Sequence, residues 1–349
     1  MSRAACGFVF SVLAIAAFTT TEAIGQSTTL QRVQARGALH CGIITEEAEY
    51  STSDDHGNRE EFDLDLCRAV AAATLGDATK IAPVEYPDDA AAMVGLAKGD
   101  VDLVATLTDD FTHTAGTHIA FTRPVLWDGV GFLLPHGSTV TNSRQLSGKK
   151  ICFLAETAIE ESTRAWFAAK HLNFVPFPYQ EEGEMEAAFA TGNCGALAGD
   201  MTHLAQTRTL FTQHGHQTRL LPERISTDPL AMASRDDDAA WSKLCDWVFE
   251  FLVAAEEYGV TRANSTAMQK EFAQPDSVNA GLRFLFGGSQ EIGNALELKN
   301  DWVVRVIAAT GNYGEIYERD LGEQSPLHLP RGENSLQRNG GLMKALPLK

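Results

Sequence analysis

The sequence has few aromatic and few basic residues. Aromatic residues make up 8% of its 349 positions, and 28 Lys and Arg stand against 46 Asp and Glu, which gives a formal net charge of -18 at pH 7. Nucleic acids and anionic membranes attract proteins through basic surfaces. We therefore expect no nucleic-acid partner.

Repeats and low-complexity segments are absent from the sequence as well. With 44% apolar and 21% charged residues, a disordered tract, a fibre and a multi-pass membrane protein are all poor fits. No internal period of about 20 to 50 residues indicates a solenoid or a propeller. The length and composition instead predict two globular lobes.

Residues 1–25 have the pattern of a secretory signal. Arg3 supplies an early positive charge, residues 8–18 form an apolar run, and residues 23–25 (AIG) suit a small-residue cleavage site. The alternative is a retained anchor, but the run is short for a bilayer of roughly 30 Å. Cys6 precedes the run, whereas a lipoprotein cysteine would follow it. We predict export as a freely soluble protein.

Cysteine is scarce and has no metal-binding spacing. No CxxC or Cys/His pattern occurs, so we predict neither a structural zinc site nor a cofactor. Cys41 lies in a first strand and Cys67 in a following helix, where a bridge would join strand to helix. Cys152 lies in a later strand, and Cys194 comes just before another. We expect these four to form disulfides, the alternative being small buried hydrophobes, and Cys245 to be a buried thiol.

The hydrophobic pattern predicts two successive α/β units. In the first, strands are expected at 38–44, 81–86, 101–105 and 129–134, with helices at 62–75 and 89–98. After residues 135–138 (PHGS) the second has strands at 150–154, 173–178 and 195–198, with helices at 158–170, 183–190 and 202–212. An extended segment at 229–233 and a helix at 239–255 follow. This alternation is typical of mostly parallel sheets covered by helices.

Two extended segments, near 131–136 and 226–231, suit a two-strand hinge. We therefore expect the first lobe to comprise residues 26–133 and 228–265, the second lobe residues 134–227, and a C-terminal extension, 266–349, to pack on the lobes. A cleft between hinged lobes is the natural place for a ligand.

A series of short segments resembles family 3 of the periplasmic solute-binding proteins, which serve amino-acid ABC transporters. The segments are RGALHCG at 36–42, FDLDLCRAVA at 62–71, GDVDL at 99–103, WDGVGF at 127–132, DPLA at 228–231, EEYGVT at 256–261, NDW at 300–302 and GNYGEI at 311–316. The last two resemble the C-terminal tail of the general L-amino-acid subgroup. The resemblance implies the α/β periplasmic-binding-protein type II fold, two lobes joined by a two-strand hinge, with a helical C-terminal extension. It also implies a monomer in the periplasm that binds a small molecule and docks to a membrane permease.

The binding loop of the first lobe departs from the pattern of these relatives. Amino-acid binders of the family carry a segment like T-x-T-x-x-R, whose guanidinium forks onto the ligand's α-carboxylate. Residues 106–114 read TLTDDFTHT and contain no arginine. Depending on how the loop is counted, Phe111, His113 or Thr114 takes its place, and Arg123 is the nearest alternative. The resemblance implies four ligand contacts in this segment: Thr106, Thr108, Asp109 and His113.

In the second lobe, relatives hold the ligand's carboxylate at a helix N-terminus, where N–H groups and the dipole favour an anion. The equivalent turn is 155–159 (AETAI), which makes Glu156 and Thr157 candidate contacts, although Glu156 could instead cap the helix. The family's acceptor for the ligand's α-ammonium maps onto Asp200. A buried ammonium needs an anionic acceptor. The alternative for Asp200 is the N-cap of the next helix.

Acidic residues gather in the loop after the first strand, and Asp109, Asp110 and Glu156 are expected to add three more carboxylates near the same cleft. The loop after the first strand contains Glu46, Glu47 and Glu49, and its Tyr50 is placed to cover the ligand, with a cation–π contact to a positive group. Acid in place of an arginine suggests a cationic ligand, an amine or guanidinium compound without a free carboxylate. The alternative is an acidic surface that has no part in binding.

Three functions compete. The first is a receptor that closes on its ligand and delivers it to the permease of an ABC transporter, for which no catalytic residue is needed. The second is an enzyme resembling cyclohexadienyl dehydratases, with Glu156 and His113 as acid and base. The third is a sensory or degenerate binder without a transport role. We predict the first, because no Ser/His/Asp or metal constellation is apparent in the sequence.

Overall fold

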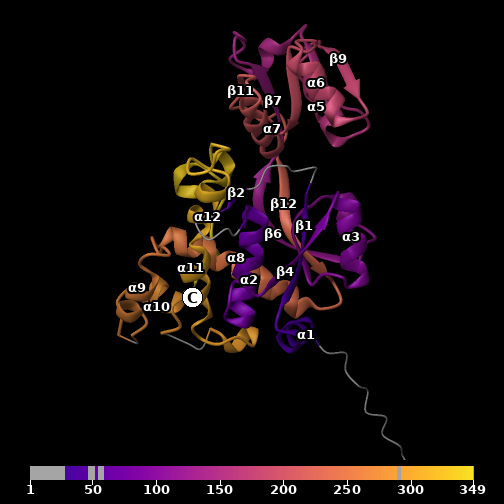
Figure 1. Ribbon diagram of the computed structural model, residues 1–349. Helices are drawn as coiled ribbons and strands as arrows, with labels where there is room; N and C mark the ends of the chain where they lie inside the picture. Colours follow the sequence, from indigo (N-terminus) through magenta and orange to yellow (C-terminus); the bar gives the residue numbers. More distant parts are fainter. Residues whose placement is uncertain (1–27, 46–51, 54–58, 275, 289–291, 349) are drawn as a thin grey trace, which may run out of the picture.

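The computed structural model describes residues 28–45, 52–53, 59–274, 276–288 and 292–348 (Figure 1). Two α/β lobes follow one another along the long axis of the molecule, each built on a five-stranded sheet. The helical C-terminal segment lies beside the first lobe. The expected signal, residues 1–25, lies outside the described residues.

The first sheet has the strand order β4-β1-β5-β12-β6. Its strands are β1 (Leu39–Ile44), β4 (Ile81–Tyr86), β5 (Leu103–Thr108), β6 (Ile119–Asp128) and β12 (Asp228–Arg235). β1, β4 and β5 are parallel, whereas β12 runs antiparallel between β5 and β6. The ends of β1, β5 and β6 and the start of β12 therefore meet at one edge of the sheet.

Helices cover both faces of the first sheet. α3 (Asp89–Lys98) packs on one face, where its Ala92 contributes to the same apolar cluster as Val104 of β5. α1 (Thr29–Arg36), α2 (Phe62–Leu75) and α8 (Ala239–Glu257) cover the other, where Leu103 and Ala105 point. The short α4 (Phe111–Thr114) follows β5, and β2 (Thr52–Ser53) pairs with β3 (Arg59–Glu60).

The second sheet has the order β11-β7-β10-β8-β9. Its strands are β7 (Val130–Pro135), β8 (Lys150–Leu154), β9 (Val175–Tyr179), β10 (Ala196–Asp200) and β11 (Thr218–Leu220). Helix α5 (Ala158–Ala169) covers one face, and α6 (Glu182–Ala190) and α7 (Met201–Gln213) cover the other. A 3-10 turn, η1 (Ser143–Leu146), precedes β8.

The chain crosses between the lobes twice, once from β6 to β7 and once from β11 back to β12. The first crossing falls at Gly129, a few residues before the boundary expected at 133, because β7 already pairs with β10 and β11 of the second sheet. Gly129 has a φ of 147°, and a Cβ there would lie 2.4 Å from the backbone oxygen of Ser226 in the other crossing. Glycine lets the two crossings touch.

The expected cysteines form two disulfides. Cys41 of β1 is bonded to Cys67 of α2, and Cys152 of β8 to Cys194 just before β10, with Cα–Cα distances of 6.1 and 5.8 Å. Each disulfide joins a strand to an element packed against it. Cys245 in α8 is a buried free thiol, as expected.

The C-terminal segment covers α2 and extends to the second lobe. It contains α9 (Ser265–Phe272), α10 (Ala280–Leu285), η2 (Asn294–Leu296), α11 (Trp302–Thr310), α12 (Tyr313–Asp320), η3 (Gly332–Asn334) and η4 (Gln337–Asn339). α11 packs on α2, which explains why α2 is apolar on nearly every side. Arg319 pairs with Asp65 of α2, and Arg208 of α7 donates to the carbonyl of Leu327.

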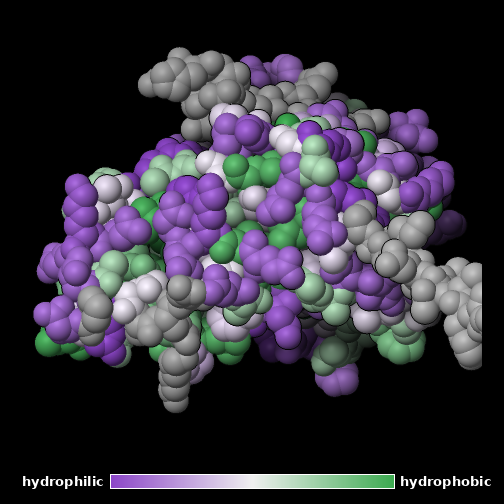
Figure 2. All heavy atoms as spheres, turned by 90° about the horizontal axis from the view of Figure 1, so that it is seen from below, coloured by the Kyte–Doolittle hydropathy of each residue, from purple (hydrophilic) through white to green (hydrophobic). Residues whose placement is uncertain are grey.

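The face of the molecule remote from the second lobe is largely polar (Figure 2). Figure 2 shows the first lobe and the C-terminal segment from the end remote from the second lobe. Hydrophilic side chains cover most of this face, and small hydrophobic areas lie between them. Among the described residues, no helix combines the length and the apolar character that crossing a membrane requires.

Candidate functional site

A cavity of ≈ 380 Å³ lies between the two lobes. The ends of β1 and β5, the starts of α2, α3, α5 and α7, and both crossings line it. The C-terminal segment contributes a further wall with Asp320, Leu321 and Leu327. A volume in the range of about 300–1,000 Å³ is typical of sites for small molecules.

The binding loop of the first lobe presents two hydroxyls and one carboxylate to the cavity. Thr106 and Thr108 both line it, and Thr106 Oγ1 donates to the Asp63 carboxylate at 2.8 Å. Asp109 does not line it: its carboxylate accepts from Thr114 Oγ1 at 3.3 Å, outside the cavity. The cavity-lining carboxylate of this loop belongs to the next residue, Asp110.

His113 lies behind the cavity wall. Its Nδ1 is 2.9 Å from Asp110 and its Nε2 is 3.9 Å from Asp89, and it is not among the lining residues. Desolvation by burial acts to raise the pKa of Asp110, but the hydrogen bonds and the charge of His113 outweigh it, so the pKa of Asp110 is lowered. Phe111, the other residue at the missing arginine's place, is 85% exposed. His113 therefore pairs with wall residues outside the cavity lining, and its contact with a ligand stays a prediction.

In the second lobe, the first turn of α5 faces the cavity through Ala158, Ile159 and Ser162. Thr157 is the N-cap of α5: its hydroxyl accepts from the backbone N–H of the third helical residue at 3.4 Å, and it does not line the cavity. Glu156 is exposed, with a left-handed φ of 61°. Thr157, and not Glu156, caps the helix, so the capping alternative for Glu156 is wrong. Glu156 does not line the cavity, and its contact with a ligand stays a prediction.

Asp200 lines the cavity, and its carboxylate does not cap α7. Asp128 takes that role: its oxygens accept from the backbone N–H groups of Met201 at 3.1 Å and Thr202 at 3.2 Å. Burial raises the pKa of Asp128, against the opposing effects of Thr202 and of Arg224, 3.9 Å away. Asp200 thus stands at the N-cap position of α7 without capping the helix through its side chain, and its contact with a ligand stays a prediction.

Arg123 cannot replace the missing arginine. Its guanidinium binds Asp246 at 2.9 Å and also Glu250, both on α8. It faces a hollow of ≈ 510 Å³ on the outside of the first lobe, not the cavity between the lobes. Tyr50, expected to cover the ligand, lies outside the described residues.

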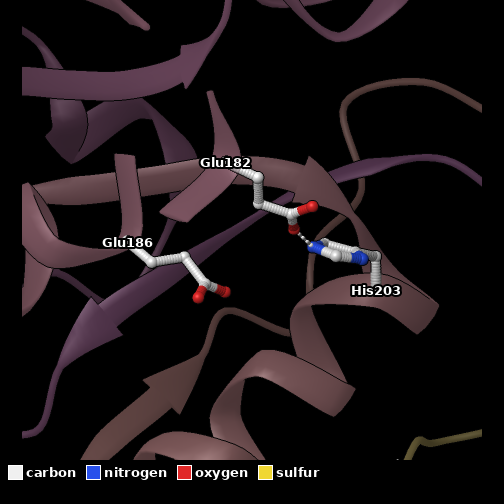
Figure 3. Close-up of side chains that lie close together, drawn as sticks. All are labelled: Glu182, Glu186 and His203. Carbon is white, nitrogen blue, oxygen red and sulfur yellow. Dashed lines mark ion pairs between the residues drawn. The ribbon is translucent and has the colours of Figure 1, made fainter. Parts of the chain in front are cut away.

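One cluster near the cavity has the composition of a metal site. Glu182 and Glu186 lie one turn apart on α6 and face His203 of α7 (Figure 3), with their ligand atoms all within 4.8 Å of one another. Glu182 forms an ion pair with His203 Nε2, and the hydrogen bond from this histidine lowers the pKa of Glu182. Two carboxylates and an imidazole could hold a divalent cation. The ion pair between Glu182 and His203 also explains why the two side chains lie together without a bound cation.

Sequence reasoning missed several residues that line the cavity. They are carboxylates at the ends of elements: Glu61, Asp63, Asp89, Asp128, Asp228 and Asp320. The first five stand where strands of the first sheet end or begin, or where helices begin, which the predicted elements could have indicated. Asp320 gave no such signal, because it reaches the cavity through the packing of the C-terminal segment.

The chain is similar to known periplasmic binding proteins over most of its length. None of the family models matches the chain. It is 35% identical to the general L-amino acid-binding periplasmic protein AapJ of Rhizobium johnstonii, over 93% of each chain. The chain belongs to the periplasmic solute-binding proteins of family 3. Its identity to the glutamate/glutamine/aspartate/asparagine-binding protein BztA of Rhodobacter capsulatus is 33%, over 97% of this chain and 98% of BztA.

A solved structure of this family has the same architecture. It is an ABC transporter periplasmic binding protein from Brucella ovis with glutathione bound, which is 33% identical to this family 3 chain with a TM-score of 0.79. The match covers 93% of this chain and 100% of the Brucella protein. The type II fold expected from the sequence, including the C-terminal helices, is confirmed.

Proposed function

We propose that the protein is an exported receptor that captures a small amino-acid-like or amine ligand between its lobes and delivers it to the permease of an ABC transporter. The cavity of ≈ 380 Å³ lined from both lobes carries this proposal. A ligand that contacts both walls stabilises the arrangement in which the lobes are close, and this shift signals occupancy. The N-terminal pattern at 1–25 supports periplasmic export, and a monomer suffices for this function.

We propose that three of the predicted residues, all of which line the cavity, contact the ligand. Asp200 accepts an ammonium from the second lobe, and Thr106 and Thr108 offer hydroxyls from the first. The N–H groups at the start of α5 offer donors. The relatives support a small polar ligand, since AapJ and BztA are named for amino acids and the Brucella protein holds glutathione.

The enzymatic alternative is not favoured by the arrangement. Its acid and base, Glu156 and His113, both lie outside the cavity lining. A dehydratase needs these groups within reach of a bound substrate. We therefore propose no catalytic residue.

The receptor function is tested by measuring binding and closure together. The full mature protein is titrated calorimetrically with amino acids, amines and glutathione, and small-angle scattering is recorded with and without each compound that binds. A smaller radius of gyration on binding supports the receptor. Turnover of prephenate or arogenate, or binding without any change in scattering, would contradict it.

A further inference from the structure

We propose that Arg208 is a positioning residue for ligand binding. It holds the C-terminal segment against the second lobe, so that Leu321 and Leu327 of this segment form a third wall of the cavity and contact the ligand. This role rests on the proposed function, because it concerns the same cavity. It adds a part of the chain outside the two lobes to the binding site.

The C-terminal segment contributes apolar side chains to the cavity. Leu321, directly after α12, and Leu327 both line it, and they are 7% and 2% exposed. They belong to the same buried apolar cluster as Phe62 and Leu126, which line the cavity from the first lobe. These four side chains form an apolar part of the lining, on which the methylene groups of a small molecule can pack.

The first lobe anchors the segment just beyond these leucines. Arg331 binds both carboxylate oxygens of Glu256 on α8, at 2.6 and 3.1 Å. Asn334 exchanges two hydrogen bonds with the backbone of Trp127 near the end of β6, at 2.7 and 2.8 Å. Bidentate pairs of this kind fix geometry as well as adding stability. The segment is therefore held as a part of the first lobe.

Arg208 attaches the same segment to the second lobe. It lies on α7 and donates to the backbone carbonyl of Leu327. Its side chain is half-buried, and this burial lowers the pKa of Arg208, because a guanidinium that is removed from water loses part of its hydration. A buried cation needs an acceptor, and the carbonyl of Leu327 supplies one. The hydrogen bond therefore fixes the wall to α7.

Helix α7 carries both this link and a part of the cavity lining. His203 and Gln206 line the cavity, and Arg208 follows Gln206 within one turn. Met201 and Ala205 lie on the same face of α7 as Arg208 and belong to the apolar cluster that contains both leucines. Releasing the segment from Arg208 should therefore displace the leucine wall from the lining residues of α7, and small displacements weaken binding strongly.

Two substitutions of Arg208 separate its hydrogen bond from its bulk. Arg208→Met keeps an apolar stem without a donor, whereas Arg208→Lys keeps a cation that can donate to the same carbonyl. Calorimetry on the full mature protein uses L-glutamine, L-arginine, putrescine and glutathione. For each compound that binds the wild type, Arg208→Met should weaken binding at least tenfold and Arg208→Lys less than threefold. The control Arg164→Met removes an exposed arginine that pairs with Glu160 on its own helix, and should change affinity less than twofold.

Hydrogen exchange of residues 321–329 in the unliganded protein measures the link without any ligand. The backbone N–H of Leu329 donates to the carbonyl of Leu321 at 2.8 Å, and local opening of the segment exposes it to exchange. Exchange should be at least tenfold faster in Arg208→Met than in the wild type, and unchanged in Arg164→Met.

The wall itself is tested by Leu327→Ala, which keeps the acceptor carbonyl and shortens the side chain. This variant should weaken the same compounds at least threefold, and it keeps the proposal testable if Arg208→Met does not fold. Circular dichroism of each variant checks that it is folded.

Wild-type affinity and exchange in Arg208→Met would overturn the proposal, and so would wild-type affinity in Leu327→Ala or a wild type that binds none of the four compounds. The receptor function is judged separately by scattering. If binding compacts the wild type and Arg208→Met binds equally well, the receptor function stands and the positioning role is wrong. If Arg208→Met loses affinity but binding does not compact the wild type, the positioning role stands and the transport function is wrong.

Discussion

At the scale of single residues, Asp200 stands at the N-cap position just before α7, but the side chain that accepts from the first N–H groups of this helix is that of Asp128. Changing Asp200→Ala should therefore leave the free energy of unfolding within about 0.5 kcal/mol of the wild type. Ligand affinity should fall more than tenfold, about 1.4 kcal/mol, because a cationic group loses its acceptor. Urea unfolding and calorimetry with the tightest-binding compound of the panel measure the two effects.

The matched control for this experiment is Glu156→Ala, an acidic residue that sequence reasoning also assigned to the ligand. Glu156 does not line the cavity, so the affinity of this variant should equal that of the wild type. Equal losses in both variants would indicate a general charge effect and not a contact at Asp200.

Glu156 offers a second prediction because of its backbone. Its φ of 61° lies in the left-handed region, which costs a residue with a Cβ roughly 1–2 kcal/mol. Changing Glu156→Gly should remove this cost and stabilise the protein by about 1 kcal/mol, seen as a higher midpoint in thermal unfolding. Glu156→Ala keeps the Cβ and should give no such gain; a gain in both variants would point to charge as the cause.

At the scale of elements, most helices and strands could be predicted because local signals define them. Helix α2 ends at Leu75, as expected, where Gly76 takes a left-handed conformation. Strand β6 was missed, because Arg123 and Pro124 interrupt its apolar pattern. β6 is the edge strand of its sheet and pairs with a neighbour on one side only, so a proline, which has no N–H to donate, is tolerated there.

The site could be predicted only in part, since it depends on contacts between distant elements. Thr106, Thr108 and Asp200 lie at the ends of predicted strands and do line the cavity. Asp109 and Asp110 are adjacent in the sequence, but only Asp110 lines the cavity. The start of α4, for which Asp110 is the N-cap, determines which of the two faces the cavity. Asp320 depends on how the C-terminal segment packs, which no local pattern encodes.

The two disulfides join elements that also touch through their cores, so their loss should reduce stability without changing the fold. They span 26 and 42 residues, and constraining loops of this size is worth about 3–4 kcal/mol each in the chain-entropy account. Changing Cys41→Ser together with Cys67→Ser, or Cys152→Ser together with Cys194→Ser, should lower the free energy of unfolding accordingly. Guanidinium unfolding measures it.

The reducing agent dithiothreitol provides the control for the cysteine variants. It should destabilise the wild type and should have no further effect on a variant that lacks both disulfides. The Cys245→Ala variant retains both bonds and should respond to reduction as the wild type does. A wild type whose stability is unchanged by complete reduction would contradict the prediction.

At the scale of the whole molecule, Asp128 of the first lobe connects the two lobes by accepting hydrogen bonds from the start of α7 in the second. Its carboxylate is buried, and burying its negative charge costs free energy. Burial raises its pKa above the ordinary value of 3.8, so the folded state holds this proton more tightly than the unfolded state does. Its contribution to stability is therefore present at low pH and is lost as the pH rises through the raised pKa. Arg224 moderates this loss.

Comparison with Asp128→Asn, which cannot titrate, isolates this effect. The free energy of unfolding of the wild type minus that of the variant should fall as the pH rises above the ordinary pKa of 3.8, and it should level off above the raised pKa. Urea unfolding at several pH values measures the difference. A difference that stays constant, or rises with pH, would show that the pKa of Asp128 is not raised in the folded protein.

The two crossings between the lobes lie against each other: the backbone N–H of Val130 donates to Ser226 Oγ at 2.9 Å, and that of Ile225 donates to the carbonyl of Val130 at 2.7 Å. A Cβ on Gly129 would lie 2.4 Å from the backbone oxygen of Ser226, so Gly129→Ala must push the crossings apart and tilt the lobes. Each lobe keeps its own core, so unfolding should remain cooperative, whereas ligand affinity should fall at least tenfold because the two walls no longer meet the ligand together.

Gly137→Ala is the control: its Cβ meets no atom within 4 Å, and it lies just beyond β7 on the same chain path. Scattering should show an altered radius of gyration in the unliganded Gly129→Ala variant alone. Unchanged scattering and affinity would mean that the lobes are held apart by the C-terminal segment, through contacts such as Arg208 with Leu327, and not by the crossings.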